Sequence, residues 1–336
     1  MSTLEILEAG PYTSVQDRGR FGGQRYGLGP AGAMDVQALA EANALVGQAA
    51  GAGALEVGPL PARFRARGGG IRIALAGAVR GVTIQGREVA NGATLLLAEG
   101  ETLAMRASRE GVFTYVAFEG GILAPQVFGS VSVHARSGIG SPLPRALIGG
   151  DTLEVGDAGL WESERTLPLA PRAMGPIRVV LGPQDDHFTE DALARLLTSE
   201  WRISPTSDRM GYRLEGPVLH HAKGHNIISD GIPAGAIQVP GSGQPLVLLA
   251  DRGTTGGYPK IATIISADLG RMAQSPAGSK VRFTAVPIEE AQQEARRMAK
   301  AVADLPRMMR SVGGGDLSPE FLLAANLAGA AIDAFD

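Results

Sequence analysis

Short apolar runs separated by turn-forming residues follow one another along most of the chain. Each run is rich in Val, Ile, Leu or Thr and is bounded by turn-forming residues such as Gly, Asp, Asn or Pro, which is typical of β-strands. A first series comprises IRIALAGA, TLLLAEGETLAMRA, GVFTYVAFEGG and DTLEVG, and a second series starts near Pro176 with IRVVLGP, GYRLEGP, AIQVPG, PLVLLAD, ATIISAD and KVRFTAV. This spacing leaves no room for helical crossovers, so it predicts mainly antiparallel strands that close into barrels or sandwiches.

Helical patterns are few. One helix is predicted over Ala31–Gly47, and a second begins after Thr189, a plausible N-cap followed by acidic residues. A third begins at Pro287, with acidic residues first and basic residues later. A last helix is expected near the C-terminus, with Ser318 as its cap and Pro319 in its first position.

The organisation predicted from these patterns has three parts. The boundary lies in the proline-rich stretch Glu162–Pro176, immediately before the second series of strands. We therefore expect a β domain over 1–170, a β-barrel domain over 176–290 and a helical C-terminal tail over 291–336. The triple glycine at 313–315 is expected to tether the end of this tail loosely.

Composition and charge exclude several classes of function. The 336 residues are 44% hydrophobic and 19% charged with a net charge of −3, so no basic field attracts nucleic acid or anionic lipid. The absence of cysteine excludes disulfides, a cysteine nucleophile and cysteine-ligated zinc. No signal-peptide pattern opens the sequence and no apolar stretch approaches the roughly 18 residues of a membrane span. We expect a cytoplasmic protein that binds neither nucleic acid nor membranes.

Familiar nucleotide and cofactor motifs are missing. The sequence contains no G-x-x-x-x-G-K-[ST], no H-E-x-x-H, no G-x-S-x-G and no Met-Lys-Met segment of the kind that carries biotin. We expect that this chain alone binds no cofactor or metal, and that ATP or a biotinylated carrier is supplied through partner subunits.

The segment from Asp251 to Lys260, DRGTTGGYPK, lies between two apolar runs. A hairpin needs only two to five loop residues, whereas this segment has about ten, which include charged, hydroxyl and phenol groups. One interpretation is the wall of a site presented by two buried strands. The other is a long turn in which Asp251 caps the backbone and Tyr258 packs on a barrel.

Three further places carry candidate chemistry. His187 follows two aspartates before a helix, so it is either a functional group or part of an acidic approach to that helix. Asp17 and Arg18 lie in a glycine-rich stretch that either presents an anion site or forms a capped turn anchoring the N-terminus. The HHAKGH histidines are interpreted as a solvated polar loop, because their spacing fits no helix face.

Several motifs together resemble one family. Four motifs occur in a fixed order: YTSVQDRGRFGGQRYGLGPAGAMD, GPQDDHF, SPTSDRMGYRLEG and GAIQVPGSGQPLVLLADRGTTGGYPKIATIISADL. With them, the chain over about residues 4–295 resembles the biotin-dependent carboxyltransferase family. This family includes allophanate hydrolase subunit 2, KipA, the C-type subunit of 5-oxoprolinase and the carboxyltransferase part of urea carboxylase. The resemblance implies a mainly β fold of two β-barrel-like halves, the second cyclophilin-like, with a few short helices and the helical tail.

The resemblance also implies an activity and partners. Family members transfer a carboxyl group from biotin to a urea-like nitrogen, or open 5-oxoproline to glutamate with ATP, or regulate a kinase inhibitor by binding. We expect the ATP-dependent 5-oxoproline reaction first, carboxyl transfer second and regulation third. The implied partners are a smaller protein of related fold, similar to allophanate hydrolase subunit 1, KipI or the B-type subunit of 5-oxoprolinase, and an A-type subunit of the lactam-hydrolase kind.

Both enzymatic reactions act on a planar amide or ureido group and build negative charge on its oxygen, which fixed donors stabilise by about 3–4 kcal/mol each. We assign catalysis to Asp251 as the base or orienting carboxylate and to Tyr258 and Lys260 as donor and cation. The predicted substrate-binding residues supply amides, hydroxyls, backbone N–H groups and charges: Gln238, Gln244, Thr254, Thr255, Gly256, Gly257, Arg209, Tyr212, His187, Asp17 and Arg18. This polar crowding, together with only 5% aromatic residues, favours an enzyme component over a pure interaction surface.

Overall fold

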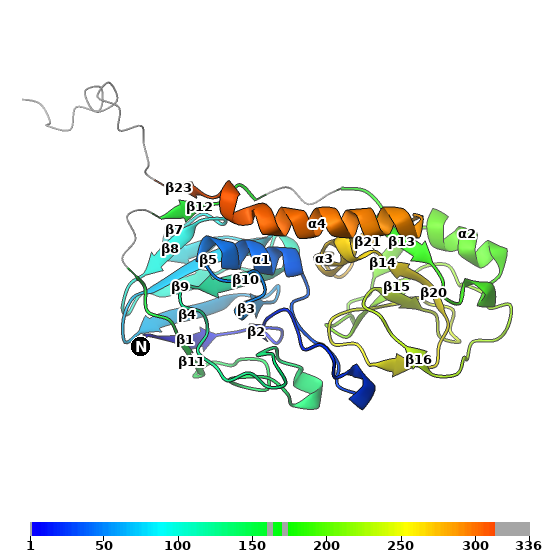
Figure 1. Cartoon of the computed structure of the whole chain (residues 1–336), viewed down its shortest axis with the longest axis horizontal. Helices are drawn as coiled ribbons and strands as arrows, with labels where there is room; N and C mark the ends of the chain where they lie inside the picture. The colour runs from blue at the N-terminus through cyan, green and yellow to red at the C-terminus, as the bar shows by residue number, and fades with distance from the viewer. Residues whose placement is uncertain (1, 160–163, 170–173, 313–336) are drawn as a thin grey trace, which may run out of the picture.

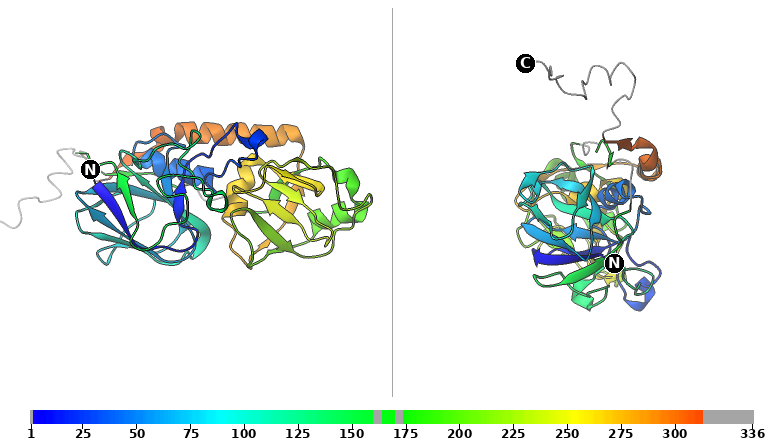
Figure 2. Two further views of the ribbon diagram at one scale, coloured as in Figure 1. Left: turned by 90° about the horizontal axis from the view of Figure 1, so that it is seen from below. Right: turned by 90° about the vertical axis from the view of Figure 1, so that its left-hand side faces the viewer.

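The computed structural model describes residues 2–159, 164–169 and 174–312. They form two β-rich halves that lie next to each other, with helix α4 (Ile288–Met308) running along one side of both (Figures 1 and 2). The mainly β fold with few helices and a helical segment towards the C-terminus is confirmed, and the second half contains a nearly closed barrel.

The first half consists of two antiparallel sheets on one apolar core. The first sheet has the order β11 (Thr152–Val155), β1 (Ser2–Glu8), β4 (Ala62–Arg67), β9 (Thr102–Met105), β6 (Val82–Ile84) and β7 (Arg87–Glu88). The second has the order β2 (Ser14–Gln16), β3 (Ala54–Val57), β10 (Glu110–Phe118), β5 (Ile71–Val79) and β8 (Thr94–Leu97). Strand β4 shows why these sequences form sheets, because its apolar residues alternate with arginines and only the apolar ones are buried.

The second half is an eight-stranded sheet. Its order is β21 (Lys280–Val281), β14 (Trp201–Ile203), β15 (Gly211–Glu215), β18 (Leu246–Leu248), β17 (Ala236–Gln238), β20 (Lys260–Ile264), β13 (Ile177–Leu181) and β22 (Phe283–Ala285). The two edge strands are separated by one residue of the chain, which brings the edges together and nearly closes the barrel. All of these pairs are antiparallel except that of β13 with β22.

The helices begin where capping side chains are available. Helix α1 (Val36–Leu45) starts later than predicted, because Asp35 is its N-cap and accepts a hydrogen bond from the Ala38 amide at 3.1 Å. The predicted Thr189 cap of α2 (Glu190–Thr198) is confirmed by a 3.1 Å bond from the Ala192 amide. Helix α3 (Leu269–Ala273) was not predicted, and the helix expected after Ser318 lies outside the described residues.

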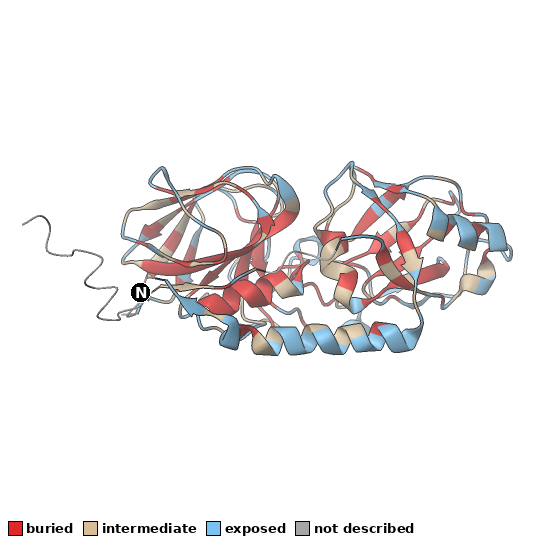
Figure 3. Ribbon diagram, turned by 90° about the horizontal axis from the view of Figure 1, so that it is seen from above, coloured by how far each residue is buried: buried red, intermediate tan, exposed pale blue. Residues whose placement is uncertain are grey.

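One apolar core continues from the first half into the second. It joins residues of α1 and β10 to residues of the barrel strands, α3 and α4. Helix α1 contacts both α3 and α4 and is almost entirely buried, whereas α4 exposes its outer face (Figure 3). In the described ranges, no helix combines the length and apolar character that a membrane crossing requires.

The Gln274 side chain ties the two halves together. Its oxygen accepts hydrogen bonds from the amides of Val112 and Phe113 at 2.8 and 2.9 Å. Its nitrogen donates to the Phe113 carbonyl at 2.9 Å and to the Asp35 carboxylate at 3.1 Å. A satisfied polar side chain at this position fixes the junction at which the candidate site lies.

A candidate active site at the junction of the two halves

The segment 251–260 is not a hairpin loop. Strands β18 and β20, which flank it, do not pair with each other, because β17 lies between them and pairs with both. Within the segment, β19 (Thr255–Gly256) pairs with β16 (Asp230–Gly231). The long-turn interpretation therefore does not hold in its simple form, since the segment crosses the end of β17 and has backbone partners of its own.

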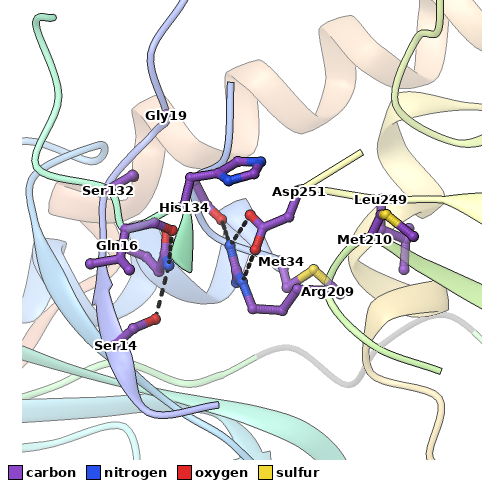
Figure 4. A network of polar contacts seen from close by, with 12 residues as sticks. Ser14, Gln16, Gly19, Met34, Ser132, His134, Arg209, Met210, Leu249 and Asp251 are labelled. Carbon is purple, nitrogen blue, oxygen red and sulfur yellow. Dashed lines mark hydrogen bonds and ion pairs between the residues drawn. The ribbon is translucent and has the colours of Figure 1, made fainter. Parts of the chain in front are cut away.

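The Asp251 carboxylate is held at the junction by Arg209. Its two oxygens accept hydrogen bonds from Arg209 Nε and Nη2, each at 3.0 Å (Figure 4). The Asp251 amide also donates to the Arg209 carbonyl at 3.0 Å. This fork fixes the orientation of the carboxylate in two directions.

Arg209 connects Asp251 to the first half. Its Nη1 pairs with the fully buried carboxylate of Glu56, and its Nη2 also donates to the Gly32 carbonyl at 2.7 Å. Burial alone would lower the pKa of Arg209, but the charges of Asp251 and Glu56 outweigh burial and hold it above its usual value. The guanidinium therefore stays charged and joins the two halves electrostatically.

Glu56 is positioned by groups of its own half. It accepts hydrogen bonds from the Tyr115 hydroxyl at 2.6 Å and from the Met34 amide at 2.9 Å. Burial, followed by the charge of Glu56, raises the pKa of Tyr115 well above its usual value, so the hydroxyl stays protonated and donates. The Tyr115 oxygen in turn accepts from the Asp35 amide at 2.8 Å.

This network changes the role expected for Arg209. All three of its nitrogens bond to protein groups, so the guanidinium is a positioning group and not a free cation for a substrate carboxylate. Asp251 is 15% exposed and lines a cavity of about 420 Å³. Its carboxylate can accept a further hydrogen bond there, since each oxygen has more than one acceptor direction.

Lys260 lies in a second polar group. Its Nζ, on a side chain only 1% exposed, pairs with Asp230 at 2.7 Å and donates to the Gly231 carbonyl at 3.3 Å. Its amide donates to Gln184 Oε1 at 3.1 Å. Lys260 therefore pairs with Asp230 and not with Asp251, which differs from the single cluster predicted from the sequence.

The other residues of the segment surround Gln238. The Gln238 amide donates to the Tyr258 carbonyl at 3.3 Å, and a Cβ on Gly256 would lie 2.7 Å from Gln238 Nε2, so only glycine fits there. The Thr254 carbonyl accepts from Ile232 at 3.1 Å, while the Gly257 carbonyl accepts from Ile227 at 2.8 Å. Tyr258 is 41% exposed.

Three predicted residues lie in other surroundings. Gln244 exchanges two 3.1 Å hydrogen bonds with the backbone of Gly216. The buried Tyr212 hydroxyl donates to the Ala273 carbonyl at 2.7 Å. His187 ends a short 3-10 turn before α2, and its Nδ1 is buried without a partner among the described residues. Gln244 and Tyr212 are thus engaged in holding the fold.

Asp17 fits the anchoring interpretation of the N-terminal stretch. Its oxygens accept hydrogen bonds from the hydroxyls of Ser130 and Ser132 and from the amides of Gly19 and Val131, at 2.5–2.8 Å. These bonds join the turn to the loop after Phe128. Arg18 is exposed, and its aliphatic stem packs against Gly51.

Sequence reasoning missed Glu56, Asp35, Tyr115 and Gln274. Glu56 carried a usable signal, because a lone carboxylate stood within the apolar run ALEV, which is buried at all four positions. Its partner Arg209 is 153 residues away in sequence, so no local pattern could pair the two. Among the described residues, no group of three or more His, Cys, Asp or Glu is placed to hold a metal ion.

Comparison with known proteins agrees with this architecture. The sequence profile of the carboxyltransferase domain, subdomains A and B, matches residues 26–285. The chain belongs to the carboxyltransferase family. The family resemblance inferred from the sequence motifs is thereby confirmed.

Relatives of this carboxyltransferase chain include named enzyme components. The C-type subunit of the 5-oxoprolinase of Escherichia coli (strain K12) is 38% identical over 290 residues, which cover 86% of this chain and 93% of the relative. The structure of the urea amidolyase of K. lactis is 25% identical with a TM-score of 0.83, over 90% of this chain. The structure of TTHA0988 is 34% identical with a TM-score of 0.76, over 84% of this chain. The match covers 20% of the K. lactis urea amidolyase chain and 55% of the TTHA0988 chain.

Proposed function

We propose that this chain is one component of a hetero-oligomeric enzyme that opens 5-oxoproline to glutamate with ATP. The observation that carries the proposal is the 38% identity to the C-type subunit of a 5-oxoprolinase over 93% of that relative. ATP is bound through the partner subunits, and the isolated chain turns over neither ATP nor 5-oxoproline.

The fixed carboxylate of Asp251 gives this chain a chemical role in the reaction. The ring amide of 5-oxoproline presents one N–H donor and one carbonyl oxygen. Asp251 accepts the N–H and orients the ring, while Arg209 and Glu56 hold Asp251 in place. Tyr258, which is 41% exposed on the same segment, supplies a phenol as donor for the charge that develops on the amide oxygen.

The partner is proposed to dock on an aromatic rim made of Phe21, Tyr26 and Phe128. These side chains are 66%, 75% and 72% exposed and line one cavity of about 610 Å³. Phe128 has a positive φ of 53°, a conformation that costs a bulky residue about 1–3 kcal/mol. Exposed aromatic side chains are typical of interface anchors, and the proposed partner on the outer side of this rim is the smaller protein of related fold, which leaves the cavity itself to a small molecule.

Carboxyl transfer is the second candidate function. It is favoured by the likeness to the K. lactis urea amidolyase, which extends over 90% of this chain. In that case Asp251 would orient a ureido N–H in place of a ring amide, and a biotinylated carrier would come from a partner.

Two experiments test these proposals. Co-expression of the chain with the smaller partner should give one joint peak in size-exclusion chromatography, and Phe21→Ser with Phe128→Ser should separate the peak without changing Tm. Leu96→Ser, which changes a side chain 46% exposed on β8, is the matched control and should leave the joint peak intact.

The second experiment distinguishes the two reactions. The complete complex is supplied either with ATP and 5-oxoproline, with glutamate as readout, or with ATP, bicarbonate, a biotinylated carrier and urea, with carboxylated urea as readout. Glutamate formation supports the first function, and carboxylation without glutamate formation rejects it in favour of the second.

A further inference from the structure

The loop between Gly19 and Gly32 is closed tightly at its base. Both glycines have a φ of +94°, and a Cβ on Gly19 would lie 2.9 Å from the Pro30 carbonyl oxygen, while one on Gly32 would lie 2.9 Å from the Gly19 nitrogen. The Arg20 amide donates to the Pro30 carbonyl at 2.8 Å. Arg20 is therefore fixed at the base of this loop, and residues 21–28 form its outer part.

The loop frames a cavity that we call the Arg20 basin. It has a volume of about 610 Å³ and is lined by Arg20, Phe21, Tyr26, Phe128, Ser137 and Ile139, among others. Most of these residues are apolar or aromatic, and Arg20 is the charged residue of the lining. A cavity of this size accommodates a small molecule.

The Arg20 guanidinium is poorly satisfied by the protein. The residue is only 1% exposed, and Nη2 donates to the Ser132 carbonyl. Nε and Nη1 are buried and have no hydrogen-bond partner in the described part of the chain. A buried donor without an acceptor costs about 1–3 kcal/mol, and more when it is charged.

The other buried arginines differ from Arg20 in this respect. Arg209 uses all three nitrogens, and Arg72 bonds to two glutamates. Arg252 donates from two nitrogens to carbonyls, and Arg80 donates from both terminal nitrogens and leaves only Nε without a partner. Arg20 alone among these five leaves two guanidinium nitrogens free, which indicates that its partner is not part of the described chain.

The surroundings of Arg20 favour an anionic partner. Burial lowers the pKa of Arg20, and the charges of Asp17 and Asp251 offset this effect only in part. The Asp17 carboxylate is already bound by Ser130, Ser132 and backbone amides, and that of Asp251 by Arg209. Neither therefore occupies the free nitrogens of Arg20, so these two donors are open to an external acceptor such as a carboxylate oxygen.

We propose that Arg20, and not Arg209, binds the carboxylate of a small substrate in the Arg20 basin. This rests on the proposed function, because 5-oxoproline carries one carboxylate beside its ring amide. Arg20 lines this basin and Asp251 lines the cavity of about 420 Å³, so Arg20 is assigned the carboxylate alone, independently of which group contacts the ring amide. The aromatic rim covers the apolar carbons of the ring and shields the ion pair from water.

The test uses the reconstituted complex and two ligands that differ only in the carboxylate. The KM for 5-oxoproline is compared with the inhibition constant of 2-pyrrolidinone, the same ring without the carboxylate. In the wild type the carboxylated ring should bind more tightly by roughly 10- to 100-fold, the scale of a hydrogen bond to a charged group. In Arg20→Gln this preference should vanish, mainly through KM, and Arg20→Lys should retain part of it.

The matched control is Arg25→Gln. Arg25 is an exposed cation of the same loop whose guanidinium lies 4.7 Å from the centre of the Tyr26 ring, and it does not line the basin. Arg25→Gln removes the same charge and should keep the preference for the carboxylated ring. Persistence of the preference in a folded Arg20→Gln complex would overturn the proposal. Absence of the preference in the wild type would also overturn it, and this result can be obtained even if Arg20→Gln does not fold.

Failure of the proposed function is distinguishable from failure of this inference. A wild-type complex that does not turn over 5-oxoproline rejects the function alone. Arg20 is then judged on the purified chain by the rise of Tm with acetate or 5-oxoproline relative to chloride at equal ionic strength. A rise that is lost in Arg20→Gln and kept in Arg25→Gln supports the anion site, and a rise that is equal in all three proteins rejects it.

Discussion

Replacing Asp251 with asparagine removes one of the two charges that neutralise Arg209. Losing one partner of a fully buried ion pair costs about 3–5 kcal/mol. The cost here should be lower, about 2 kcal/mol, because Asp251 is 15% exposed and Glu56 still compensates the guanidinium. For a domain of this size class, that loss lowers Tm by about 4–8 °C.

Activity should fall far more than stability. If Asp251 orients or deprotonates the substrate amide, kcat of the reconstituted complex drops on the order of 10²-fold at a temperature where the variant is fully folded. Unfolding is followed by circular dichroism or calorimetry, and turnover by glutamate release.

The control is Asp230→Asn, which breaks the pair between a 53% exposed carboxylate and Lys260. It should lower Tm less than Asp251→Asn. A folded Asp251→Asn complex with wild-type kcat would refute the role assigned to Asp251, and an unchanged Tm would refute the energetic role of the Arg209 bridge.

Two further predictions concern acid stability and the junction of the halves. Burial alone would raise the pKa of Asp268, but hydrogen bonds from Arg178 and the charge of Arg271 hold the pKa below its usual value of 3.8. The ionised carboxylate therefore stabilises the fold above pH 3.8. This stabilisation is lost as the pH falls through the lowered pKa. Asp268→Asn should therefore lower Tm more at pH 7 than at pH 2, as thermal scans at both values will show. An equal loss at both values contradicts this. Gln274→Leu leaves the amides of Val112 and Phe113 without an acceptor and should lower the free energy of unfolding by about 2–4 kcal/mol, as measured by urea unfolding. The kcat per folded complex should stay within about twofold. A loss of stability below about 0.5 kcal/mol would show that the Gln274 bridge does not hold the halves together.

Much of the fold could be predicted from local patterns. The strands β5, β10 and β13 coincide with apolar runs, and the Thr189 cap is a local signal that holds in the structure. The pairing order could not be predicted, since adjacent runs such as β18 and β20 are separated by β17 in the sheet. Helix α3 has five residues, too few for a periodic pattern to stand out.

The candidate site was predictable only in part. The polar segment between two apolar runs predicts Asp251 as a site carboxylate, and the structure places Asp251 at a cavity. The placement of Lys260 in a separate group follows from its pairing with Asp230, 30 residues earlier. The distinction between a saturated Arg209 and an unsatisfied Arg20 depends on contacts with Glu56 and Ser132, which are distant in sequence. Patterns along the chain report which groups are present, whereas their availability depends on tertiary partners.

We propose that this chain is an obligatory part of a 5-oxoproline-opening enzyme. The most direct measurement is the ATP-dependent release of glutamate from 5-oxoproline as purified chain is titrated into the other purified components at fixed concentration. We predict no glutamate from the chain alone, little from the other components alone, and a rate that rises with added chain and saturates at a fixed ratio. A full rate without the chain, or no rate at any ratio in a complex that forms, would contradict the account.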